Sequence, residues 1–174
     1  MKLSGKVWKF GDTVGATDIV GAQYDSIGMS RQWAECAKHV FEDTDPSIAG
    51  AIQPGDIVVA GESFGAGHAH YYSTAIMACK TAGITGFLVE SIGGLFQRAC
   101  IDFGLAGWPL PGISDFVSQG DHLEIDLATG AATNITTGAT TQFKPVSRTI
   151  LDIVEADGSK NWALKRVGAE HAIA

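Results

Sequence analysis

The sequence has little cysteine and no long apolar run, and each shortage excludes a class of protein. Its three cysteines, Cys36, Cys79 and Cys100, are odd in number and widely spaced, and no Cys-x-x-Cys pair is present. This argues against a disulfide framework and a cysteine-ligated metal, so we expect reduced thiols packed in the core. No apolar stretch approaches the roughly 20 residues of a membrane helix, and the first residues lack the apolar core of a signal peptide. The sequence therefore predicts a cytoplasmic protein with no membrane partner.

Positive charge is also scarce. The chain has 12 Lys and Arg residues against 19 Asp and Glu residues, a net charge of −7, and no basic run. Nucleic-acid binding draws much of its affinity from clustered cations on phosphates, so we expect no nucleic-acid partner. The composition is 45% hydrophobic over 174 residues, which is ordinary for a globular protein. Such a chain can bury a core without a disulfide or a metal, and we expect a single domain over residues 1–174.

Two consecutive β–α units are predicted in the middle of the chain. Residues 56–60 form an apolar run after Pro54-Gly55, and a helix-like segment over 71–82 follows and stops at Gly83. Residues 84–89 and 93–103 repeat this order of strand and helix. Two such units favour an α/β fold with a parallel core sheet and right-handed crossovers.

The rest of the chain predicts further strands and helices. Residues 5–10 are expected to form a first strand, and Ser30 is expected to cap a helix from Arg31 to about Phe41. Residues 122–127 alternate apolar and polar side chains and turn into 131–136, which predicts a hairpin followed by a short strand near 142–144. Helices are predicted over 148–155 and 160–167.

A glycine-rich turn joins the strand at 56–60 to the helix at 71–82. Gly65 and Gly67 let the backbone approach a ligand, and the free N–H groups of the helix's first turn favour negative charge. A carboxylate or phosphate ligand is therefore one interpretation, and a structural turn with no ligand is the other. The turn lacks the third glycine of the dinucleotide-binding fingerprint.

Four segments of the chain match one family. They are 5–12 (GKVWKFGD), 37–46 (AKHVFEDTDP), 54–65 (PGDIVVAGESFG) and 151–156 (LDIVEA). With them the chain resembles, over nearly its whole length, the small subunit of 3-isopropylmalate dehydratase, which corresponds to the swivelling domain of aconitase. The resemblance implies a swivelling β/β/α fold and a partner large subunit that holds a [4Fe-4S] cluster. It also implies that the small subunit closes the site and supplies a base and carboxylate-binding groups.

The chain departs from the family at the residues that contact substrate. Where the family usually has Gly-Ser-Ser-Arg, with the first serine as base and the arginine as carboxylate clamp, this chain has Gly67-His68-Ala69-His70. A second substrate-binding arginine of the family is replaced by Gln23. Histidine is mostly neutral near pH 7 and is a weaker clamp but a better base than arginine. Glutamine hydrogen-bonds neutral groups as readily as carboxylates, so the site favours a less anionic substrate.

These residues define the predicted site. His68 is the predicted catalytic base, and Gln23, His70 and the turn at Gly65, Gly67 and Ala69 are predicted to place the substrate. His68 as a helix cap and His70 as a solvated residue are the alternatives that remain open. A metal between the two histidines is not expected, since no third ligand lies nearby in the sequence.

The predicted function is that of a hydro-lyase small subunit. It would add or remove water on a hydroxy-acid substrate together with an iron–sulfur large subunit, and it would hold no cofactor itself. The alternative is a diverged, non-catalytic homologue that forms a homo-oligomer or regulates a partner.

Overall fold

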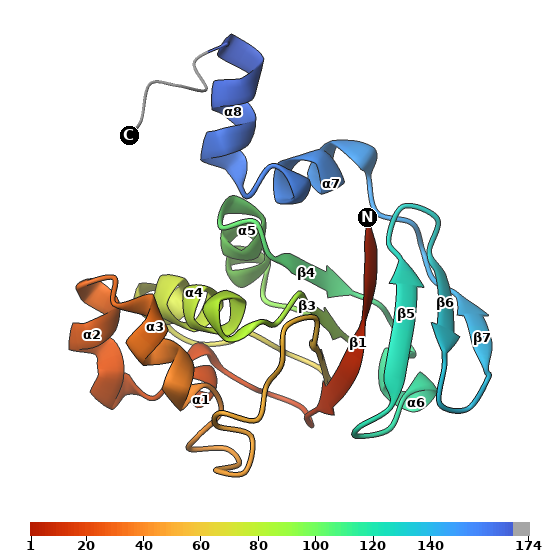
Figure 1. The fold of residues 1–174 in the computed structure, drawn as a ribbon, viewed down its shortest axis with the longest axis horizontal. Helices are drawn as coiled ribbons and strands as arrows, with labels where there is room; N and C mark the ends of the chain where they lie inside the picture. Colours follow the sequence, from red (N-terminus) through yellow and green to blue (C-terminus); the bar gives the residue numbers. More distant parts are fainter. Residues whose placement is uncertain (169–174) are drawn as a thin grey trace.

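A mixed sheet of seven strands forms the centre of the protein, in the order β4-β3-β2-β1-β5-β6-β7 (Figure 1). The computed structural model describes residues 1–168. Strands β1 to β4 pair in parallel, and β5 to β7 pair antiparallel, with β1 joining the two halves. The strands are β1 (Lys2–Lys9), β2 (Ile57–Ala60), β3 (Gly86–Val89), β4 (Ala106–Pro109), β5 (His122–Asp126), β6 (Ala131–Asn134) and β7 (Thr140–Gln142).

Helices occupy most of the connections between the strands of the parallel half and the end of the described chain. Short 3₁₀ turns lie over Ala22–Tyr24, Ala37–His39 and Ala69–Tyr71. The helices are α1 (Ala16–Ile19), α2 (Asp25–Met29), α3 (Trp33–Cys36), α4 (Tyr72–Ala82), α5 (Gly94–Asp102), α6 (Ile113–Phe116), α7 (Arg148–Glu155) and α8 (Ser159–Val167). None of the helices within residues 1–168 combines the length and apolar character needed to cross a membrane.

The parallel half has the predicted β–α units. Every residue of β2 and β3 is buried, as expected for strands covered on both faces. The two strands pair in register from Ile57 opposite Gly86 to Ala60 opposite Val89. Helix α4 follows β2 and ends at Gly83, whose left-handed backbone caps it. The predictions for 56–60, 71–82 and 84–89 are therefore confirmed to within a few residues.

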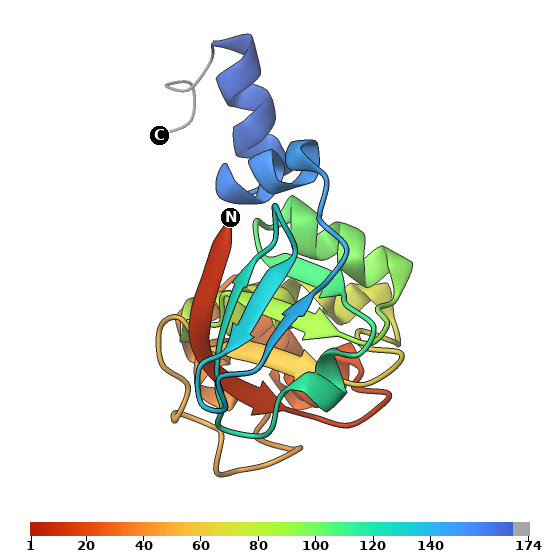
Figure 2. The ribbon, with the colours of Figure 1, turned by 90° about the vertical axis from the view of Figure 1, so that its right-hand side faces the viewer.

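The antiparallel half folds over one face of the parallel half. One buried cluster contains residues of both halves, including Ile57 and Leu88 from parallel strands and Leu123 and Ile125 from β5. A second cluster lies on the other face, where Val58 and Phe87 pack with residues of α4 and α5. Figure 2 shows the antiparallel strands in front of the parallel ones. The sheet thus curls into two layers with helices outside, in agreement with the β/β/α arrangement that the resemblance implied.

The predicted helix from Arg31 to Phe41 is wrong. Ser30 lies at the end of α2 and does not cap the start of a following helix. Helix α3 is only four residues long, and a 3₁₀ turn follows it. Arg31 and Phe41 both have positive φ, 56° and 58°, which breaks helical geometry at each end. The N–H of Phe41 donates to the carbonyl of Ile19 at 2.7 Å, so a contact with a distant segment overrides the local apolar spacing.

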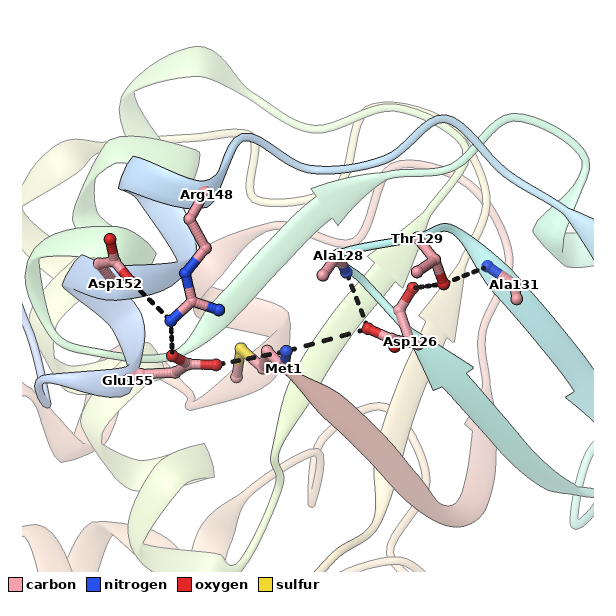
Figure 3. Close-up of polar contacts among 8 residues, drawn as sticks. All are labelled: Met1, Asp126, Ala128, Thr129, Ala131, Arg148, Asp152 and Glu155. Carbon is pink, nitrogen blue, oxygen red and sulfur yellow. Dashed lines mark hydrogen bonds and ion pairs between the residues drawn. The ribbon is translucent and has the colours of Figure 1, made fainter.

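Helix α7 contacts the start of the chain through Glu155, and the amine of Met1 lies between this residue and Asp126 at the end of β5 (Figure 3). The amine of Met1 lies 3.3 Å from Glu155 and 3.9 Å from Asp126. Arg148 lies 2.9 Å from Glu155 and 2.7 Å from Asp152. Beyond α7, helix α8 projects from the body of the protein in both views (Figures 1 and 2).

Candidate functional site

The loops that follow β1, β2 and β3 meet at one edge of the sheet, because the carboxyl ends of parallel strands share an edge. Ligands of open α/β sheets bind at that edge. The N–H of Gly61 donates to the carbonyl of Gly11 at 3.0 Å, and the N–H of Thr13 donates to the carbonyl of Glu62 at 2.7 Å. The N–H of Ser63 donates to Ser91 Oγ at 2.8 Å. Three loops far apart in sequence therefore form one connected surface.

The glycine turn at 65–70 pairs directly with the loop after β1. Gly15 and Ala66 form an isolated parallel bridge, and the N–H of Gly65 donates to the carbonyl of Val14 at 2.8 Å. The hydroxyl of Tyr72 donates to the carbonyl of Gly67 at 3.0 Å and anchors the turn on α4. The structure thus holds the loop that follows β1 against the glycine turn that was predicted to place the substrate.

The backbone of this turn is conformationally demanding. Gly65 has φ of 71°, and a Cβ at this position would lie 2.2 Å from Cγ of Phe96, a fully buried ring. Nearby, Thr13 and Ser63 both have φ of 61°. Such conformations are costly for residues with a Cβ and persist where surrounding contacts enforce them, which is frequent at functional sites.

His68 is the residue before the 3₁₀ turn that leads into α4, and it caps that turn. Its Nδ1 accepts a hydrogen bond from the backbone N–H of His70 at 3.2 Å, and its carbonyl accepts from the N–H of Tyr71 at 3.1 Å. The imidazole is exposed. The capping interpretation of His68 therefore has a geometric basis. It also means that the N–H groups of His70 and Tyr71 are already used and are not free for an anion.

His70 has a carboxylate partner that the sequence did not identify. Its Nε2 lies 3.0 Å from Asp25 Oδ2, at the first residue of α2. The side chains of His70 and Asp25 are 40% and 31% exposed, so the pair lies at the surface and is partly covered by the protein. Asp25 lies two residues beyond Gln23, just outside the residues predicted to contact substrate. The signal that could have found it is an acidic residue close in sequence to Gln23 that could pair with a histidine of the turn.

Gln23 also has a carboxylate partner within the protein. Its Nε2 donates to Asp43 Oδ2 at 2.9 Å, in the 37–46 segment of the family resemblance. In the same segment, Glu42 accepts from the hydroxyl of Tyr24 at 2.9 Å and contacts His39 Nδ1 at 2.5 Å. The hydrogen bonds from His39 and Tyr24 lower the pKa of Glu42 and hold it ionised.

Negative charge dominates around these loops. Residues 10–30, 39–79 and 81–97 contain no Lys or Arg, but they contain Asp12, Asp25, Asp43 and Glu62. Glu90, after β3, accepts from the N–H groups of Gly112 and Ser114, both at 2.7 Å. Burial would raise the pKa of Glu90, but these backbone donors outweigh it and lower the pKa. The loops themselves therefore offer no fixed cation to a substrate carboxylate.

The cysteines are poorly suited to bind a metal. Cys36, Cys79 and Cys100 are all buried, and burial raises the pKa of each thiol. A metal needs the thiolate, which burial disfavours. No group of three or more His, Cys, Asp or Glu side chains with metal-binding geometry occurs within residues 1–168.

The chain is similar over its full length to known small subunits. It is 35% identical over 170 residues to the "3-isopropylmalate dehydratase small subunit" of Thermodesulfovibrio yellowstonii, covering 98% of each chain. It is 37% identical over 167 residues to "3-isopropylmalate dehydratase small subunit 1" of Thermotoga maritima, covering 96% of this chain and 97% of the relative. A crystal structure of 3-isopropylmalate dehydratase from Methanocaldococcus jannaschii superimposes with a TM-score of 0.86, at 27% identity and 99% coverage of both chains. No family model matches the chain.

Proposed function

This chain belongs to the family of 3-isopropylmalate dehydratase small subunits, and from that premise we propose that its carboxyl-edge loops form part of a two-subunit hydro-lyase site. The reaction is addition or removal of water across a carbon–carbon double bond next to a carboxylate. The proposal is supported by the pairing of Gly15 with Ala66, which joins the turn that contains His68 and His70 to the loop that follows β1. The relatives are named as enzyme subunits, so the regulatory alternative is not favoured.

The second part of the proposal concerns the partner. The family resemblance implies a large subunit with a [4Fe-4S] cluster that acts as a Lewis acid on the substrate. The buried, high-pKa thiols of this chain do not fit cluster ligation. We therefore assign the cluster to the large subunit and the proton-transfer and positioning groups to this chain.

The residues that replace the family's two arginines indicate the substrate class. Gln23 and His70 stand at these positions, and each already contacts a carboxylate: Gln23 contacts Asp43, and His70 contacts Asp25. A guanidinium binds a carboxylate through two hydrogen bonds and a fixed charge, which neither replacement supplies. The proposed substrate is therefore a hydroxy acid that is uncharged at the end that the family's arginines would hold.

The proton-transfer group of this chain is one of the two imidazoles of the turn. The sequence assigned this role to His68, at the position of the family's basic serine, and His70 was assigned to substrate placement. Both side chains are exposed. The sequence from residue 39 to residue 79, which includes both histidines, contains no Lys or Arg. Imidazole can exchange a proton near neutral pH, where a serine hydroxyl needs strong activation.

Reconstitution with an iron–sulfur large subunit tests the proposal. We expect the chain alone to be colourless and inactive, and the mixture to dehydrate hydroxy acids or to hydrate the corresponding unsaturated acids. Paired substrates that differ only in an ester or amide in place of the second carboxylate test specificity, and the uncharged member should have the higher kcat/KM. A mixture without hydratase activity on either member would refute the function, and preference for the dicarboxylate would refute the substrate class alone.

A further inference from the structure

Hydrogen-bond direction fixes the tautomer of His70. An ionised carboxylate can only accept, so the contact between His70 Nε2 and Asp25 Oδ2 at 3.0 Å requires the proton on Nε2. Neutral His70 then carries its lone pair on Nδ1. Donation from Nε2 to the carboxylate fixes the orientation of the ring. The negative charge of the carboxylate also balances the positive charge that the ring gains when Nδ1 accepts a proton.

The same reasoning gives His68 the opposite character. A backbone N–H can only donate, so His68 Nδ1 is the acceptor in its 3.2 Å contact with the N–H of His70. Neutral His68 therefore carries its proton on Nε2 and presents a donor. To act as a base through Nδ1, His68 would have to give up the bond that caps the turn.

Asp25 is dedicated to this contact. It begins α2, directly after the 3₁₀ turn that contains Gln23, and its Oδ2 faces His70 across 45 residues of sequence. Its Oδ1 is buried, and among the described residues it has no hydrogen-bond partner. A buried carboxylate oxygen without a partner leaves the His70 contact as the interaction that keeps Asp25 in place.

We propose that Asp25 is a positioning residue that holds His70 as the proton acceptor, with His68 as a neutral hydrogen-bond donor; the proposal rests on the hydro-lyase function above. In dehydration, His70 Nδ1 takes the proton from the substrate carbon, and the C–H electron pair becomes the second bond of the double bond. The C–O bond breaks, and hydroxide leaves with its electron pair and takes up one proton from solvent to become water, while the imidazolium later releases its proton to solvent. The imidazolium of His70 is balanced by Asp25. His68 Nε2–H donates to a substrate oxygen and keeps its proton.

The tautomers can be measured without activity. ¹⁵N NMR of the full chain at about pH 8.5, where model imidazoles are neutral, should show Nε2–H for both histidines. Asp25→Asn should move His70 toward a mixture with Nδ1–H, because the amide can also donate, and should leave His68 unchanged. Asp102→Asn, an exposed aspartate at the end of α5, is the matched control and should change neither. Nδ1–H on wild-type His70, or no response to Asp25→Asn, would overturn the positioning role.

Turnover in the reconstituted complex separates the two histidines. His70→Gln should lower kcat roughly 10²–10⁴-fold, and Asp25→Asn roughly 10–100-fold with KM little changed. His68→Gln keeps an N–H donor and should lower kcat less than His70→Gln does, and Asp102→Asn, far from the turn in sequence, should retain the wild-type turnover. Loss of kcat in His68→Gln with normal turnover in His70→Gln would overturn the assignment. A complex with no hydratase activity in the wild type would refute the function and the proton-acceptor role, while the NMR result still decides whether Asp25 sets the tautomer.

Discussion

The two halves of the sheet differ in how their connections are held. In the antiparallel half each turn is held by a hydrogen bond within the turn. The N–H of Gly130 donates to the carbonyl of Asp126 at 2.6 Å, and the N–H of Gly138 donates to the carbonyl of Asn134 at 2.8 Å. In the parallel half the loops are held by hydrogen bonds between different loops, such as the bond from the N–H of Glu62 to Asp12 Oδ1 at 2.7 Å, across 50 residues of sequence. Local sequence therefore determines the antiparallel turns, and tertiary contacts determine the loops of the candidate site.

The largest effect should come from crowding the glycine turn. Gly65→Ala combines a left-handed backbone, φ 71°, with a Cβ placed against the buried Phe96 ring. We expect a loss of roughly 2–5 kcal/mol, the sum of conformational strain and overpacking. Gly138→Ala is the matched control in the antiparallel half, with φ 76° and open space, and should cost about 1–2 kcal/mol. Urea unfolding measures both, and equal losses would show that packing around the turn does not matter.

An intermediate effect is expected from Glu90. Glu90→Gln weakens the bonds to the N–H groups of Gly112 and Ser114 and should cost about 1–3 kcal/mol at neutral pH. Glu124→Gln, at an exposed residue of β5, should change the stability by no more than about 0.5 kcal/mol.

The Glu90 effect should depend on pH. The folded pKa of Glu90 is lowered from 4.5, so its contribution is fully present above that value and is lost as the pH falls through the lowered value. The wild type and Glu90→Gln should therefore converge in acid. Unfolding curves at neutral and acid pH test this, and a difference that grows in acid would mean that the pKa is raised instead.

The smallest effect should come from the exposed ion pairs of α7 (Figure 3). Arg148 is 65% exposed and contacts Asp152 and Glu155. Arg148→Gln should cost about 0.5 kcal/mol or less, and added salt should remove the difference, because exposed pairs are screened. A cost above that of Glu90→Gln would contradict this order of effects.

The sequence predicted the elements whose pattern is local. The buried run at 56–60, the stop at Gly83 and the alternation at 122–127 each depend on neighbouring residues, and each was confirmed. The helix over 31–41 failed because Phe41 bonds to Ile19, a contact that no local pattern encodes. The site shows the same division. The family resemblance predicted Gln23, His68 and His70 as site residues, which stays a prediction, and the partners Asp25 and Asp43 required the three-dimensional structure.

Two histidine variants test whether the loops of the parallel half carry the function. In the reconstituted complex, kcat is measured for His70→Ala and for His122→Ala, whose imidazole contacts Ser4 Oγ at 3.0 Å on β5 of the antiparallel half. We expect His70→Ala to lower kcat roughly 10²–10⁴-fold and His122→Ala to turn over like the wild type. Equal kcat for the two variants would show that these loops do not carry the function.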